Sequence, residues 1–160
     1  MAQHVMPTIP YIIFGYVEPI ILACACFVAL KYPHQYLRSL GPTPDTYQPD
    51  DASLAAILSL GNVFLLAGLA QFLCCNVSKE VHIARSFIYL LVLADWGHLW
   101  ATYMGIGYDI FINPRLWNTA AAVNIGGAVA MNIIRFAYLF GFFGKDNENL
   151  LKEDVVKKVK

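Results

Sequence analysis

The order of apolar and polar residues divides the chain into four long apolar stretches separated by polar segments. The apolar stretches cover residues 9–30, 53–75, 86–104 and 119–143. Each has about the twenty residues that a helix needs to cross the hydrocarbon core of a bilayer. The pattern predicts an all-α integral membrane protein that folds as a four-helix bundle. The expected domains are a four-transmembrane-helix domain at 1–143 and a basic tail at 144–160.

The polar segments predict how the bundle lies in the membrane. Segment 31–52 is rich in proline and is expected to be an irregular loop, whereas segment 105–118 is rich in aromatic residues, as at lipid headgroups. Seven Lys and Arg residues lie on the side of the second loop and the tail, and three lie on the opposite side. The positive-inside rule therefore predicts that both termini are cytosolic.

Composition agrees with a membrane protein, because 58% of the 160 residues are hydrophobic and only 14% are charged. The net charge is +0, which argues against a nucleic-acid partner. The four cysteines lack metal-site spacing and are interpreted as small packing residues. The end of the tail, Lys157-Lys158-Val159-Lys160, is similar to a dilysine retrieval signal and predicts the endoplasmic reticulum membrane. The other interpretation of the tail is an amphipathic helix.

Ionisable residues inside the apolar stretches are the strongest functional signal, because unpaired charges at membrane depth cost several kcal/mol. Asp95 and His98 are three residues apart, so they share one helix face. The Glu18-Pro19 pair deprives the Gly15 carbonyl of its usual backbone donor and predicts a bend beside a carboxylate. The expected catalytic residues are Glu18, Asp95, His98 and Arg135.

Amide side chains accompany these ionisable groups. Asn124, Asn132 and Arg135 fall in one stripe of the fourth stretch, and Asn62 lies in the second stretch. We expect these groups to face inward around a polar pocket, with Asn62, Asn124 and Asn132 binding substrate or water. The alternative is a structural network in which amides hydrogen-bond across helices for about 1 kcal/mol or less each.

Two carboxylates in different surroundings can act as an acid and a base. In one hypothesis Asp95 stays ionised beside Arg135 or His98, and a less well paired Glu18 carries a proton; the reverse assignment stays open. Suitable reactions are epoxide opening by water, ring closure or double-bond migration. The sequence lacks a GxSxG, P-loop, GxGxxG or HExxH motif, so we expect neither a cofactor nor a catalytic metal.

Four motifs carry a resemblance to a known family. They are Tyr16-Val17-Glu18-Pro19, Asp95-Trp96-Gly97-His98, Trp117-Asn118 and the stripe from Asn124 to Arg135. Over residues 11–143 the chain resembles small fungal four-helix membrane proteins that accompany secondary-metabolite pathways. Some of these look like membrane epoxide hydrolases or cyclases, and the architecture is similar to the emopamil-binding (EXPERA) sterol isomerases and the meroterpenoid cyclases.

The resemblance implies an acid/base enzyme that acts on a lipophilic polyketide or terpenoid. Tyr16 and Trp117, which lie within the shared motifs, are assigned to substrate binding. The alternative is a non-catalytic lipid-binding or scaffold protein that delivers intermediates to pathway enzymes. Expected partners are a lipophilic substrate, the bilayer, and either other pathway enzymes or further copies of the chain.

Overall fold

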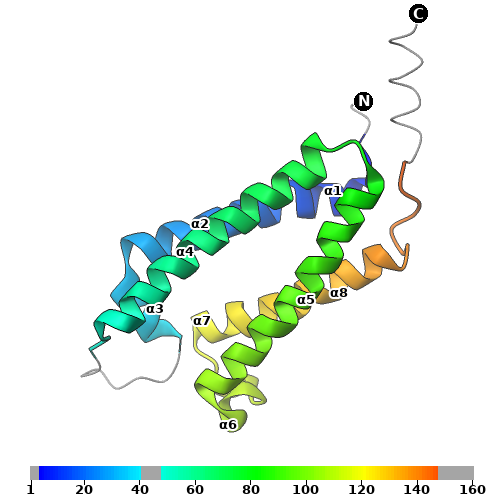
Figure 1. The fold of residues 1–160 in the computed structure, drawn as a ribbon. Helices are drawn as coiled ribbons and strands as arrows, with labels where there is room; N and C mark the ends of the chain where they lie inside the picture. Colours follow the sequence, from blue (N-terminus) through cyan, green and yellow to red (C-terminus); the bar gives the residue numbers. More distant parts are fainter. Residues whose placement is uncertain (1–3, 41–47, 148–160) are drawn as a thin grey trace, which may run out of the picture.

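The computed structural model describes residues 4–40 and 48–147, and these residues form helices and turns without any strand (Figure 1). Three π-helical segments and one 3-10 turn interrupt or join the α-helices. In chain order the elements are α1 (Thr8–Ile12), η1 (Ile13–Val17), α2 (Glu18–Lys31), α3 (Pro33–Ser39), α4 (Asp51–Phe72), η2 (Leu73–Val77), α5 (Val81–Ile106), α6 (Tyr108–Phe111), η3 (Pro114–Leu116), α7 (Thr119–Ala121), η4 (Ala122–Gly127) and α8 (Ala128–Leu139).

Three continuous helices in the described part of the chain are long and apolar enough to cross a membrane. They run over Thr8–Lys31, Asp51–Val77 and Thr119–Leu139, with mean hydropathies of 2.2, 2.0 and 1.4. These ranges confirm three of the predicted apolar spans. The remaining predicted span, 86–104, lies inside α5, which has 26 residues and a length of about 39 Å at 1.5 Å per residue. The helix α5 is less apolar than the other three because it contains Arg85, Asp95 and His98.

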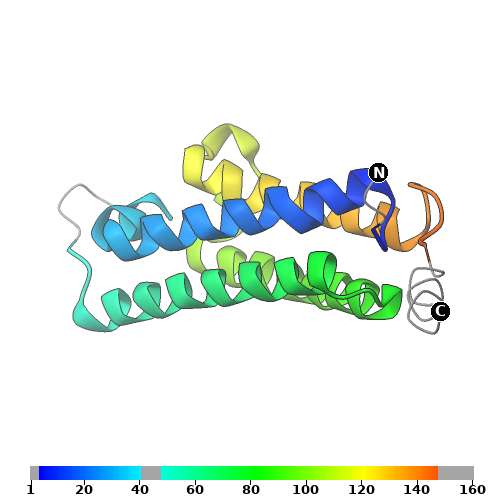
Figure 2. The same ribbon diagram turned by 90° about the horizontal axis from the view of Figure 1, so that it is seen from above.

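The helices pack as two antiparallel pairs, α2 with α4 and α5 with α8, as Figures 1 and 2 show. Small residues permit the close approach of α2 and α4. A Cβ atom on Gly61 would lie 3.1 Å from Leu30 Cδ2, and one on Gly68 would lie 3.3 Å from the Pro19 carbonyl oxygen. This contact has the small-residue character of many membrane helix interfaces.

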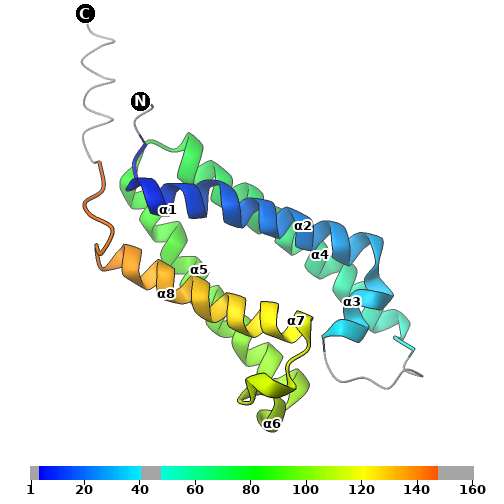
Figure 3. The same ribbon diagram turned by 180° about the vertical axis from the view of Figure 1, so that it is seen from behind.

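The two pairs join at the end of the bundle where both described chain ends lie. A buried apolar cluster fills that end and contains Val5, Met6, Phe14, Cys75, Ala84, Ile88 and Tyr138. The backbone amide of Asn147 donates to the Val5 carbonyl at 2.9 Å, so the two ends of the described chain are side by side. At the far end, visible in Figure 3, Asn118 Nδ2 donates to the Ser39 carbonyl at 3.1 Å and ties α7 to α3.

The side chains are distributed as expected for a protein in lipid. Large apolar residues point outward, including Leu66 at 68% exposed and Ile20 at 61% exposed. By contrast, Gln71 and Arg135 have side chains that are almost completely buried. A protein that keeps its polar groups inside and its apolar groups outside has the arrangement that a bilayer requires.

One predicted loop contains more structure than the sequence indicated. Segment 31–52 was expected to be irregular, but it begins with α3, because Pro33 occupies the first helical turn, where its missing N–H costs nothing. Its remaining residues at 41–47 lie outside the described part of the chain. Asp50 caps α4 by accepting from the Ser53 amide at 2.7 Å. Hydrogen bonds from the Ser53 side chain and backbone lower the pKa of the Asp50 carboxyl.

Candidate functional site

The candidate site begins at the irregular turn before Glu18. Within η1 the Glu18 amide donates to the Ile13 carbonyl, five residues back, instead of to Phe14. The residue that follows is Pro19, which has no N–H to offer either Phe14 or Gly15. Two carbonyls inside the membrane segment therefore need donors from elsewhere.

Amide side chains from the second span supply these donors. Gln71 Nε2 donates to the Phe14 carbonyl at 2.9 Å, and Asn76 Nδ2 donates to the Gly15 carbonyl at 2.8 Å. A buried carbonyl without a partner costs about as much as a lost hydrogen bond. One residue of α4 and one of η2 thus stabilise the irregular turn, and Glu18 lies directly after it.

We expect Asn76→Ala to lower the free energy of unfolding by about 1–3 kcal/mol, because the Gly15 carbonyl would lose its side-chain donor in a buried environment. The measurement is thermal unfolding of the purified chain in detergent. Asn62→Ala is the matched control, since Asn62 is exposed and its amide reaches only the Leu58 carbonyl of its own helix at 3.4 Å. Equal effects of the two substitutions would contradict the role assigned to Asn76.

The centre of the site is an ionic network that links four helices. The Arg135 guanidinium of α8 is 2% exposed; its Nη2 donates to Glu18 Oε1 of α2 and its Nη1 donates to Asp95 Oδ2 of α5. Gln71 Nε2 of α4 donates to Glu18 Oε2 at 2.6 Å. Asn132 Nδ2, one turn before Arg135, donates to Asp95 Oδ2 at 2.8 Å. We call these five residues the ionic network.

The charges of the ionic network do not balance when both carboxyls are ionised. Two carboxylates then share one guanidinium, and the sum is a single negative charge. An excess charge inside an apolar bundle is costly. One bound proton removes it.

Several polar atoms of the ionic network have no partner in the described part of the chain. Gln71 Oε1, Asn132 Oδ1 and Arg135 Nε are buried without a hydrogen bond. Both hydrogen bonds to Asp95 end on Oδ2, so Oδ1 receives none from the described residues. Asp95 is also the more accessible carboxylate, with a side chain 20% exposed against 9% for Glu18. The ionic network therefore has hydrogen-bonding capacity that the described residues do not use.

A family model described as a domain of unknown function, DUF7704, matches residues 3–145. The chain belongs to the DUF7704 family. The match contains every helix of the structure and all five residues of the ionic network. No curated protein and no solved structure matches the chain.

In this DUF7704 member the structure brings together four of the predicted site residues, Glu18, Asp95, Asn132 and Arg135. The expectation that Glu18 is less well paired than Asp95 is wrong, because both oxygens of Glu18 accept hydrogen bonds. His98 is half-buried one turn from Asp95 on the same helix.

Other predicted site residues lie apart from the ionic network of the DUF7704 fold. Asn124 is half-buried in η4, about 16 Å along the helix from Arg135. Trp117 lies at the end of the bundle that is far from the described chain ends, where its Nε1 donates to the Ile110 carbonyl at 2.9 Å. Tyr16 is 42% exposed and faces outward. Asn62 was expected to face inward, and this was wrong: it is exposed on the outer side of α4.

Sequence reasoning missed Gln71, although the pattern of the second span, α4 with η2, contains the necessary signal. Ile57, Gly61, Gly68, Gln71 and Cys75 recur at intervals of three, four and seven residues, and all five are buried. That spacing defines one helix face, on which Gln71 lies and Asn62 does not. In the described part of this DUF7704 chain, no group of three or more His, Cys, Asp and Glu side chains could hold a metal ion.

Proposed function

We propose that this chain is a membrane-embedded acid/base enzyme that opens or cyclises an epoxide on a lipophilic polyketide or terpenoid. The observation that supports it most is the ionic network, in which two carboxylates share one buried guanidinium while polar atoms around them lack partners. A network built only to hold helices together would be expected to satisfy its own buried atoms. A substrate with an acceptor oxygen and a hydroxyl group would supply the hydrogen-bond partners that the ionic network lacks.

The proposal includes four membrane crossings, with α5 as the third, and cytosolic termini in the endoplasmic reticulum membrane. An even number of crossings agrees with the contact between Val5 and Asn147 at one end of the bundle. The dilysine-like end of the tail, which lies outside the described residues, would then face its cytosolic receptor. Protection of a C-terminal tag from protease in sealed microsomes would contradict this orientation.

Within this proposal the proton of the ionic network lies on Asp95 Oδ1. Glu18 has donors on both oxygens and forms a neutral pair with Arg135. Asp95 Oδ1 is the carboxylate oxygen that receives no donor from the described residues, so a proton there displaces no hydrogen bond. This assignment reverses the hypothesis that favoured Glu18 as the acid.

The reaction follows from this arrangement. Asp95 donates its proton to the epoxide oxygen as one ring C–O bond breaks, while water or a hydroxyl of the substrate forms a new C–O bond at that carbon. The nucleophile gives its proton to His98, which returns it to Asp95. Water yields a diol and a substrate hydroxyl yields a cyclic ether with a free alcohol, without any net gain or loss of protons. Glu18 and Arg135 position Asp95 and do not exchange protons with the substrate.

The test is an assay of microsomes that contain the chain, using a panel of lipophilic epoxides in ¹⁸O-labelled water. Hydrolysis would place one labelled oxygen in a diol, and cyclisation would give an isomer of the substrate without label. Microsomes from cells lacking the chain are the control for other epoxide-opening activities. Absence of conversion over that control, with the chain present and folded, would contradict the proposal.

The second candidate function is non-catalytic binding of a lipid that is passed to other enzymes. It is favoured by an apolar groove on the outer surface of the α2–α4 pair, which contains none of the charged groups. Binding of a lipophilic compound, equal in the wild type and in Asp95→Asn and without conversion in either, would support this function instead.

A further inference from the structure

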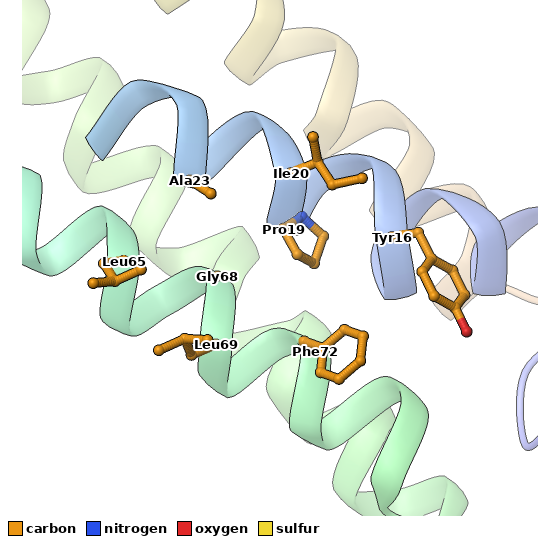
Figure 4. A pocket seen from close by; sticks show the side chains of 8 residues that line it. All are labelled: Tyr16, Pro19, Ile20, Ala23, Leu65, Gly68, Leu69 and Phe72. Atoms are coloured by element: carbon orange, nitrogen blue, oxygen red, sulfur yellow. The ribbon is translucent and has the colours of Figure 1, made fainter. Parts of the chain in front are cut away.

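The outer surface of the bundle has a groove between the first span and α4, shown in Figure 4. Its volume is about 330 Å³. The side chains that line it are Tyr16, Pro19, Ile20 and Ala23 from the first span and Leu65, Gly68, Leu69 and Phe72 from the second. We call this feature the α2–α4 groove. Because Ile20 is 61% exposed and Leu69 is 55% exposed, the α2–α4 groove opens to the lipid.

Small residues account for the hollow. Ala23 and Gly68 fill little space beside the larger side chains that line the groove, such as Ile20 and Phe72 in Figure 4. Gly68 also lets the backbones approach, since a Cβ atom there would lie 3.3 Å from Leu22 Cβ. The helices are therefore close together at the floor of the groove, and the space above it is left to another molecule.

One end of the groove carries a pair of phenol groups. The hydroxyl oxygens of Tyr11 and Tyr16 are 2.9 Å apart, and Tyr16 packs edge-on against Phe72 with ring centroids 6.1 Å apart. Two hydroxyls have two hydrogens, and the bond between them uses one. The other remains available to an oxygen atom of a ligand.

The position of this pair in the membrane indicates how a ligand would lie. Tyr11 is near the start of the first span, which begins at Thr8. Ala23 lies about 10 Å further along the helix from Tyr16. The hydroxyl pair is thus nearer one membrane surface, and the apolar part of the groove runs from there through the middle of the span, which is the orientation of a membrane amphiphile.

We propose that the α2–α4 groove binds a neutral amphiphile, with its hydroxyl, carbonyl or epoxide oxygen at the Tyr11–Tyr16 pair and its apolar body against Pro19, Ala23 and Gly68. The lining residues include no charged side chain, so a phosphate headgroup would gain no counter-charge. The inference goes beyond the proposed function, because no residue of the ionic network lines the groove, and it holds whether or not the chain is a catalyst.

The experiment is photolabelling of the full chain in phosphatidylcholine nanodiscs with hexadecanol that carries a mid-chain diazirine. Labelled residues are located by mass spectrometry, and unlabelled hexadecanol and hexadecane are used as competitors. We expect labelling to concentrate on the groove residues. We also expect hexadecanol to compete at least about fivefold better than hexadecane, which corresponds to one net hydrogen bond of about 1 kcal/mol.

Variants distinguish the groove from ordinary contact with lipid. Ala23→Phe fills the hollow and is expected to reduce labelling at least fivefold. Tyr16→Phe keeps the ring, and it should reduce the advantage of hexadecanol over hexadecane. Leu66→Phe is the matched control, because Leu66 is 68% exposed on the same helix pair and lies outside the groove.

Labelling spread evenly over the lipid-facing residues would overturn the proposal and show adventitious bilayer contact only. Unchanged labelling in folded Ala23→Phe would overturn it as well. If Ala23→Phe does not fold, Tyr16→Phe decides, since an isosteric change at an exposed position preserves the packing: equal competition by the two compounds in wild type and variant would exclude a polar end of the site.

Discussion

Asp95→Asn is expected to lower the rate of epoxide opening at least a hundredfold while leaving the chain folded. Asparagine keeps the shape of the side chain, and its amide oxygen can still accept from Arg135 and Asn132, which now contact Asp95 Oδ2. It cannot donate a carboxyl proton to an epoxide. General acid catalysis contributes about 10²–10⁴ in rate, and that contribution would be lost.

The measurement is turnover in microsomes, with folded yield in detergent measured for every variant. Glu18→Gln is the informative comparison, since Glu18 supports Arg135 but is not expected to exchange a proton with the substrate. It should lower the rate less than Asp95→Asn and leave the shape of the pH–rate profile unchanged. A larger loss in Glu18→Gln than in Asp95→Asn would reverse the assignment of the acid.

Arg135→Met is expected to destabilise the bundle by about 3–5 kcal/mol. The guanidinium is 2% exposed and is the charged partner of both Glu18 and Asp95. Its removal leaves the negative charge of the two carboxyl groups inside an apolar bundle without a counter-charge, and breaking a buried ion pair from one side has a cost of that size. The effect should appear as a lower midpoint of unfolding in detergent and a lower folded yield.

The effect of the lost charge on stability can be separated from the effect of lost packing by also removing the charges of the other ionic-network residues. In the triple variant Arg135→Met, Glu18→Gln, Asp95→Asn no charge of the ionic network remains, and we expect most of the lost stability to return. Lys145→Met is the control for removing a positive charge at an exposed position. If the triple variant is as unstable as Arg135→Met, the arginine contributes through packing and not through charge.

Part of this architecture could be predicted from local sequence. Three spans could be predicted because the length and apolarity of a segment can be read from that segment alone, and a helix needs about twenty apolar residues to cross a bilayer. Glu18-Pro19 likewise indicated a disturbed helix, since proline removes a backbone donor wherever it lies in a helix. The inward position of Arg135 follows from the cost of exposing a charge to lipid.

The rest depended on how the helices pack. Asn62 and Gln71 are both amides of the second span, and polarity alone does not say which of them faces inward. Gly61 and Gly68 determine which face of α4 is buried, because they allow α4 to pack closely against α2. Gln71 lies on that buried face. The pairing of Arg135 with both Glu18 and Asp95 could not be predicted from local sequence, because it depends on the relative positions of three helices.

The π-helical turn η1 gives the first span one place where the loss of a residue can be absorbed. A π turn accommodates one residue more than an α turn, so deleting one residue from Ile13–Val17 would restore an ordinary helix and leave the residues before it facing nearly the same way, whereas a deletion in a regular part of the span would rotate them by about 100°. Tyr11 and Tyr16 meet across five positions because of this extra residue. A single-residue deletion within η1 would therefore disturb the packing of the first span less than a deletion elsewhere in it, and its main local effect would be to change the spacing between Tyr11 and Tyr16.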